Sequence, residues 1–353
     1  MNTDPIHFSV GLACYATGSD FPIPPFEQQI LLLSRAYGVD ACVFSPLSID
    51  CTLSSPEVPV QYWDGTAFRQ AVAPVPKILD CRFGLLKKKA YAWLQPERHR
   101  WLLEHSTFSD YYAIPKEKLS QLLMCSPLYD LAIPTYRVTE YEQLLRLAKM
   151  LQHCIVKPSG GYKGRHVCRV DYDGVSLTKE TLEGTEKLTQ EQWAKYLDLL
   201  ANEEMGQPLL QPRLDFSLND EHAVDFRLLV AHGGSGTWEE VAIYSRVGAT
   251  KLVSNISGGG SFADAESVLS AIAGTEADKL LDRLHHIAAE LPVFIQRQVE
   301  RPITCLGIDV GIDRKTLDPY VLEANTFPGS KYHSWQLAHK RVQYYQYLLR
   351  NMK

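Results

Sequence analysis

The sequence predicts an α/β domain followed by a larger α+β region, and three observations lead to this fold class. The chain has 353 residues, and at ~150 residues per domain this length suggests two or three lobes. It opens with a predicted strand, helix and second strand, an order typical of a parallel α/β layer. Farther along, strand-like runs follow one another across glycine-rich or polar turns, which indicates antiparallel hairpins.

The N-terminal domain is expected to end near residue 130. Two prolines between residues 127 and 135 interrupt the helical periodicity and indicate a boundary. The first strand is not followed by GxGxxG, so the dinucleotide-binding fingerprint is absent. The elements expected before the boundary are strands at 7–14, 39–44 and 74–81, a helix at 26–37 and a largely helical stretch at 85–123.

Two hairpins organise the rest of the chain. The first has a glycine-rich turn, and the second is expected to be centred on Thr316. Thr189 is a suitable N-cap for one of the helices. The expected elements are helices at 140–151, 189–205 and 276–291, strands at 154–157, 167–170, 223–231, 241–247, 304–310 and 320–324, an apolar connector at 208–214, a glycine cluster at 258–260 and a helical tail.

Composition excludes several classes of protein. Hydrophobic residues make up 45% and charged residues 22% of the chain, ordinary globular values that argue against disorder. The formal net charge of −5 offers no basic surplus for a nucleic-acid groove. The longest apolar runs fall far short of the roughly 20 residues of a membrane span, and residues 1–10 do not resemble a signal peptide. We therefore expect a cytoplasmic protein without nucleic-acid or membrane partners.

The eight cysteines are expected to be reduced and mostly buried. They stand singly, without the close ligand pairs of a zinc site or the density of a disulfide framework.

Three oxygen donors are expected to converge in the last hairpin. Asp309 would lie opposite Glu323, and Asn325 would share the face of Glu323 because strand side chains alternate. Magnesium prefers a few such ligands and completes its shell with water and phosphate oxygens. The alternative is a solvated hairpin with its polar residues outward. Asp309 and Glu323 interrupt apolar runs, where unpaired carboxylates would be costly, so the metal site is favoured.

The segment CIVKPSGGYKGRHV, residues 154–167, could bind phosphate. Lys157 ends an apolar strand, and the residues after it free the backbone to approach an anion. The segment does not match the Walker A pattern, and such a turn is as often a structural hairpin as a ligand loop. The small residues concerned are Ser159, Gly160, Gly161 and Gly164.

Two arginines on neighbouring strands are further candidates. Asp225 and Arg227 share one strand face, an arrangement that could equally be a surface ion pair. Arg246 ends the next strand, and the polar loop containing Asn255 could donate backbone N–H groups to an anion.

The order of these motifs resembles the ATP-grasp superfamily. It runs from the lysine and glycine-rich hairpin through D-x-R, a second arginine and a glycine loop to E-A-N-T-F-P-G, and covers residues 116–328. W-D-G at 63–65, the strand at 74–82 and the stretch 116–135 are similar to the YheC/YheD family, described as spore-coat-associated.

The resemblance implies a fold and a binding site. It implies a Rossmann-like pre-ATP-grasp domain at 1–115, a small lobe at 116–207 and a large lobe with the magnesium site at 208–353. It also implies ATP and two Mg²⁺, with the phosphates near Lys157 and the γ-phosphate near Arg227 and Arg246. The other implied nucleotide contacts are Ser159, Gly160, Gly161, Gly164 and Asn255, an upstream cation at Arg137, and adenine against Gln211, Pro212, Arg213 and Leu214; the implied metal ligands are Asp309, Glu323 and Asn325.

The implied activity is an ATP-dependent carboxylate–amine ligase that forms an amide or peptide bond through an acyl phosphate. Its substrates would be small-molecule or peptide carboxylates and amines. Two alternatives remain open: a small-molecule kinase that phosphorylates hydroxyls, and a non-catalytic spore-coat or assembly protein that retains the fold.

Overall fold

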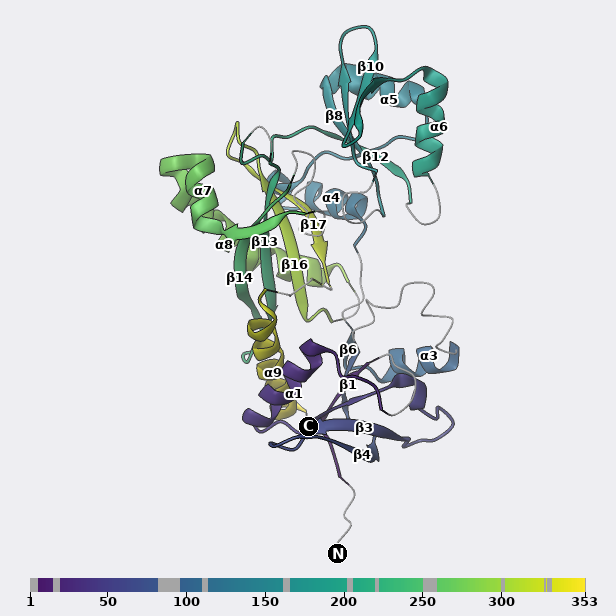
Figure 1. Ribbon diagram of the computed structural model, residues 1–353, viewed down its shortest axis with the longest axis vertical. Coiled ribbons are helices and arrows are strands. Elements are labelled where there is room, and N and C mark those ends of the chain that lie inside the picture. The colour runs from purple at the N-terminus through teal and green to yellow at the C-terminus, as the bar shows by residue number, and fades with distance from the viewer. Residues whose placement is uncertain are drawn as a thin grey trace, which may run out of the picture.

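The computed structural model contains three β-sheets that follow one another along the long axis of the molecule (Figure 1). None of the described helices is long and apolar enough to span a membrane. The structure describes residues 6–14, 20–81, 96–109, 114–160, 166–201, 206–219, 222–249, 259–299, 302–326, 328 and 332–352.

The N-terminal sheet is mixed, with the strand order β4-β3-β2-β1-β5-β6. Its parallel pairs β1–β2, β1–β5 and β5–β6 confirm the α/β prediction. The antiparallel hairpin β3–β4 was not predicted, although Asp64-Gly65 at its turn is a hairpin signal and Gly65 has φ +107°. The elements are β1 (Val10–Ala13), α1 (Pro25–Ala36), β2 (Ala41–Phe44), β3 (Glu57–Trp63), β4 (Phe68–Pro74), β5 (Ile78–Cys81), α3 (Pro96–His105) and β6 (Phe108–Ser109).

The second sheet is antiparallel, with the order β11-β10-β9-β8-β12-β7, and helices α5 and α6 cover one face around the buried Trp193. Thr189 caps α6 in a capping box, as predicted. The expected connector at 208–214 is corrected, because residues 208–212 form a strand whose prolines stand at its two ends. The elements are β7 (Tyr136–Arg137), α5 (Tyr141–Leu151), β8 (His153–Pro158), β9 (Cys168–Tyr172), β10 (Leu177–Thr181), β11 (Gly184–Lys187), α6 (Gln190–Leu200) and β12 (Pro208–Pro212).

The third sheet is antiparallel, with the order β15-β14-β13-β16-β17. One face packs against α4, α7 and α8 in the largest apolar core. Phe226, Leu228 and Val230 of β13 point into this core, which leaves Asp225 and Arg227 on the opposite face. The elements are α4 (Lys116–Met124), β13 (Val224–His232), β14 (Trp238–Val247), β15 (Ser261–Asp264), α7 (Ala265–Ala273), α8 (Ala277–Arg297), β16 (Cys305–Ile312) and β17 (Pro319–Asn325).

The C-terminal helix α9 (Ser334–Asn351) packs on α1 in the N-terminal core, although it follows the third sheet in the chain. Its buried Arg341 donates to Asp80 at the end of β5, at 2.5 Å from Nε and 2.6 Å from Nη2. Arg341 also donates from Nη1 to Thr304, just before β16, at 2.8 Å. This helix therefore connects the first and third sheets, and the division of the chain at residues 116 and 208 stays a prediction.

Candidate active site

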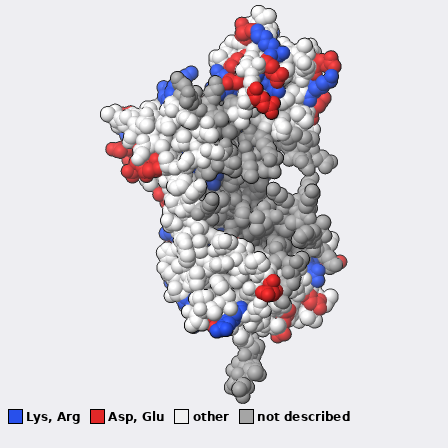
Figure 2. Space-filling view, in the orientation of Figure 1, with Lys and Arg blue, Asp and Glu red and all other residues white. Residues whose placement is uncertain are grey.

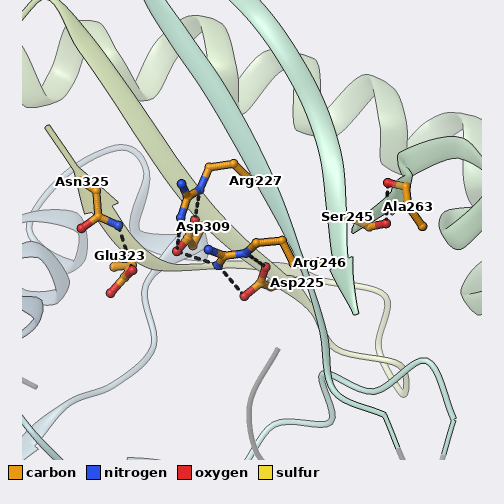
Figure 3. Close-up of polar contacts among 8 residues, drawn as sticks. All are labelled: Asp225, Arg227, Ser245, Arg246, Ala263, Asp309, Glu323 and Asn325. Carbon is orange, nitrogen blue, oxygen red and sulfur yellow. Dashed lines mark hydrogen bonds and ion pairs between the residues drawn. The ribbon is translucent and has the colours of Figure 1, made fainter. Parts of the chain in front are cut away.

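A row of charged side chains crosses the face of the third sheet that lies opposite its apolar core (Figure 3). The register places Arg227 of β13 opposite Asp309 of β16, and Asp309 opposite Glu323 of β17. Asp225 lies opposite Arg246 of β14. Paired residues of antiparallel strands project to the same side, so the structure confirms the predicted alignment of Asp309 with Glu323.

Two carboxylates and two guanidinium groups alternate in the centre of this row. Arg246 donates to both oxygens of Asp225, at 2.6 and 2.7 Å, and its Nη2 lies 2.7 Å from Oδ2 of Asp309. Arg227 donates to Asp309 from Nε, and from Nη2 at 3.1 Å. All four side chains are buried or nearly so. The mutual pairing offsets the high cost of removing these charges from water.

Asp309 and Glu323 have opposite pKa shifts. Burial alone would raise the pKa of Asp309, but the charges of Arg227 and Arg246 outweigh it and hold this pKa well below its usual range. Burial, and then the charge of Asp309, raise the pKa of Glu323, while Lys116 opposes the rise. The two carboxylates therefore face each other, and the positive charge near Glu323 is too small to keep its pKa at the usual value.

This donor set fits a divalent cation. Asn325 donates from Nδ2 to Glu323 at 2.8 Å, which directs its amide oxygen elsewhere. Asp309 accepts from the arginines at three of its roughly four lone-pair positions, and its side chain also hydrogen-bonds with that of Glu323. Within the described residues, no group of three or more His, Cys, Asp or Glu side chains could hold a metal ion. Substrate or water oxygens would thus complete the coordination that Asp309 and Glu323 begin, and Asn325 would have to rotate its amide to join them.

Two lysines approach Glu323 from other parts of the molecule. Lys116 begins α4, and its Nζ lies 3.6 Å from Oε2 of Glu323. Lys157 lies in β8 of the second sheet, where burial and then the charge of Lys116 lower its pKa to about 7, against the attraction of Glu323. The predicted Lys157 is therefore brought to the predicted Glu323, and Lys116 joins them as a residue that was not predicted.

Packing explains the positions of two site residues that were not predicted, Lys116 and Gly307. Leu119 and Leu123 bury α4 in the core beneath β17, which places Lys116 beside the sheet. Gly307 in β16 lies under Arg227: an added Cβ would be 2.6 Å from Pro328 and 3.0 Å from Nη1 of Arg227. In the sequence, the only local signals for these two residues were a lysine after Pro115 and a glycine within a predicted strand.

Other predicted nucleotide contacts lie around the second sheet. Ser159 follows β8 and is held to Gln207 by two hydrogen bonds, of 2.8 and 3.0 Å. Gly160 is the next residue, whereas Gly161, Gly164 and Asn255 lie outside the described residues. Gln211 is buried and donates to Thr135 at 2.7 Å.

Two predicted residues are directed elsewhere. Arg213 donates to Asp171 at 3.0 Å. Of its neighbours, Pro212 ends β12 and Leu214 is half-buried. Arg137 is exposed and donates to Glu117 at 3.0 Å. Neither arginine contacts the charged row through a bond among the described side chains.

A comparison with protein families decides the assignment. The model for YheC/D-like ATP-grasp proteins matches residues 105–353. The chain belongs to this family.

A sequence relative matches part of this YheC/D-like ATP-grasp protein. The chain is 27% identical over 206 residues to the endospore coat-associated protein YheC of Bacillus subtilis (strain 168). The match covers 56% of this chain and 54% of that protein, so the chain spans about half of the relative's length.

Two solved structures match nearly the whole chain. D-cycloserine synthetase DcsG is 15% identical with a TM-score of 0.52, covering 95% of this chain and 99% of its own. The ATP-grasp ligase PsnB, in complex with a phosphomimetic variant of a minimal precursor, Mg and ADP, is 12% identical with a TM-score of 0.52, covering 97% and 99%. At these identities the likeness shows the fold, which confirms the predicted ATP-grasp architecture.

Proposed function

We propose that this protein is an ADP-forming carboxylate–amine ligase that uses ATP and magnesium to make an amide or peptide bond. One arrangement carries the proposal: Lys157 and Lys116 meet Glu323 at one end of a buried row whose centre is Asp309 between two arginines. Cations around a carboxylate pair suit the transfer of a phosphoryl group, which needs positioning and charge neutralisation rather than a nucleophilic side chain.

The nucleotide would lie between the second and third sheets. Lys157 and Lys116 would bind its phosphates, and the backbone around Ser159, Gly160, Gly161 and Gly164 would approach them closely. Asp309, Glu323 and Asn325 would hold magnesium, which neutralises phosphate charge when bound. Adenine would lie against Gln211, Pro212, Arg213 and Leu214. Arg137 and the loop that contains Asn255 would lie at the periphery of the nucleotide site.

The reaction would proceed in two steps. A substrate carboxylate oxygen attacks the γ-phosphorus, the bond from this phosphorus to the β–γ bridging oxygen breaks, and ADP leaves. A neutral amine then attacks the carbonyl carbon of the acyl phosphate, phosphate leaves, and the nitrogen releases a proton. Arg227 and Arg246 would stabilise the negative charge on the phosphoryl group during the first step.

Trapping with hydroxylamine tests this proposal. Protein, ATP, magnesium and a panel of amino acids, dicarboxylic acids and peptides are incubated with hydroxylamine, and ADP and hydroxamate are measured. A ligase yields hydroxamate with at least one carboxylate, because hydroxylamine intercepts the acyl phosphate. ADP formation that depends on a hydroxyl acceptor and gives no hydroxamate would identify a kinase instead.

A scaffold role is the second candidate, because the Bacillus relative is named for its association with the endospore coat. A scaffold would bind nucleotide without forming ADP with any acceptor of the panel. The buried Asp225–Arg246–Asp309–Arg227 network favours the ligase, since a fold kept only for assembly has no need of four charges that are costly to bury.

A further inference from the structure

Aromatic side chains occupy the end of the charged row that lies away from the lysines. Phe262 of β15 pairs with Arg246, and Tyr244 of β14 pairs with Arg227. Paired residues share a face, so both rings project to the side of the sheet that carries Asp309. The order of the strands places this aromatic end at β14–β15, whereas Glu323 lies at the opposite edge on β17.

The segment that leads into α9 adds two more rings to this end of the face. The rings of Phe262 and Tyr332 have centroids 3.9 Å apart, and those of Tyr244 and His333 are 5.0 Å apart. Phe262 remains 44% exposed and Tyr332 38% exposed. Trp335, two residues after His333, is 50% exposed. Exposed aromatic surface gathered at one place is typical of a binding site rather than of a core.

Arg246 joins this aromatic end to the reaction centre. Its Nε and Nη2 atoms donate to Asp225 and Asp309, while its Nη1 donates to no described residue. A guanidinium group can bind a carboxylate with the donors that remain. If the phosphates occupy the lysine end, a substrate carboxylate that attacks the γ-phosphorus in line has to come from the other side of the arginines.

We propose that the carboxylate substrate carries an aromatic ring, which packs against Phe262 and Tyr332 while its carboxylate meets Arg246. The inference rests on the proposed ligase function and adds the chemical class of the substrate. A ring fits because aromatic side chains favour offset or edge-to-face packing with other rings. A free aromatic amino acid and a peptide with an aromatic C-terminal residue supply the same chemistry.

Calorimetric titration tests the inference without turnover. Protein saturated with Mg-ADP is titrated with L-phenylalanine, L-alanine, Gly-Gly-Phe and Gly-Gly-Ala. We expect at least one aromatic ligand to bind about tenfold more tightly than its alanine counterpart, the gain of about one aromatic contact. A preference confined to the tripeptides identifies a peptide substrate, and one confined to the amino acids identifies a free amino acid.

Three variants locate the effect. Phe262→Ala should abolish the preference for phenylalanine and leave the affinity for alanine ligands unchanged, while Phe262→Tyr should retain it. Phe68→Ala is the matched control, because Phe68 is 39% exposed on β4 of the N-terminal sheet. Equal binding of both ligand types, no binding of any aromatic ligand, or an unchanged preference in Phe262→Ala would overturn the inference.

Hydroxamate measurements separate this inference from the function on which it rests. If hydroxamate formed only from non-aromatic carboxylates, and at the same rate in Phe262→Ala, the proposed ligase function would stand and the aromatic substrate would be overturned. Aromatic ligands that bind through Phe262 but give neither ADP nor hydroxamate would uphold the binding site and contradict the ligase.

Discussion

Glu323 differs from its neighbour Asp309 because only Asp309 is surrounded by guanidinium groups. Arg227 and Arg246 keep Asp309 ionised, whereas burial and the charge of Asp309 raise the pKa of Glu323. The nearest cation to Glu323 is Lys116, at 3.6 Å among the described side chains. A divalent cation between the two carboxylates would lower the pKa of Glu323, so this residue is the sensitive half of the proposed metal site.

Glu323→Gln should lower turnover by roughly a hundredfold or more, because it removes a charge from the proposed metal site while keeping the shape of the side chain. The fold should persist, since Gln resembles the protonated form that burial already favours. Steady-state ADP release measures the effect, and Glu186→Gln, exposed on β11, serves as the control. Turnover close to that of the unmodified protein would contradict the role of Glu323.

Lys157 should make nucleotide binding depend on pH. Burial and Lys116 lower its pKa to about 7, and bound phosphates would raise it again. Below pH 7 the ammonium is already charged in the free protein, so the contribution of Lys157 to the affinity is at its maximum. Above pH 7 binding requires the uptake of a proton, and the affinity for Mg-ADP should fall by up to about tenfold per pH unit.

Titration of Mg-ADP between pH 6 and 9 measures this dependence. Lys157→Arg is the matched control, because an arginine stays charged over the whole range and reports the ionisation of the nucleotide alone. Identical pH profiles for the two proteins would show that Lys157 does not titrate on binding.

At the scale of elements, local periodicity predicted the hairpin β16–β17 but not the placement of α4. The alternation of side chains in two strands was enough to align Asp309 with Glu323. Between Asp309 and the turn, a β-bulge shifts the register by one residue. The predicted register was symmetric about Thr316 and did not include this bulge. Lys116 reaches Glu323 only because α4 packs on β17, about 200 residues later in the chain, and no local pattern encodes such a contact.

The strand β12 shows why composition misled the prediction. Its prolines at 208 and 212 suggested an apolar connector, yet the three residues between them form a strand that lies between β8 and the edge strand β7. Leu209 of β12 pairs with Lys157 of β8 on one side and with Arg137 of β7 on the other, so these side chains share one face of the sheet. Arg137 was inferred as the upstream cation from its position in the sequence, whereas Lys116 is the cation that the fold brings close to Lys157.

The contact between α9 and β5 should dominate the stability of the N-terminal domain. Arg341→Ala would leave the carboxylate of Asp80 buried without its bidentate partner, and breaking such a pair costs about 3–5 kcal/mol. Urea unfolding measures this loss. Arg350→Ala, at the exposed end of the same helix, should change stability by less than about 0.5 kcal/mol. A similar small loss in both variants would refute the structural role of Arg341.

At the scale of the whole molecule, the surface and the interior use charge differently. Both signs are interspersed over the second sheet and its helices on the face shown in Figure 2. Among the ion pairs of this region, Lys187–Asp173 and Lys195–Glu191 are exposed. Exposed pairs of this kind contribute little to stability. The network around Asp309 is buried instead, and the net charge of −5 therefore says little about the site.

Binding of Mg-ADP should join the second and third sheets, because Lys157 belongs to one and Glu323 to the other. A ligand that binds only the folded protein stabilises it by about 2.7 kcal/mol at a concentration 100 times its Kd. Thermal unfolding should therefore shift upward with Mg-ADP, and EDTA should remove most of the shift. Lys157→Ala should reduce the shift, whereas Lys195→Ala, exposed on α6, should not. An equal shift with and without EDTA would show that the nucleotide binds independently of the carboxylates at the β16–β17 edge.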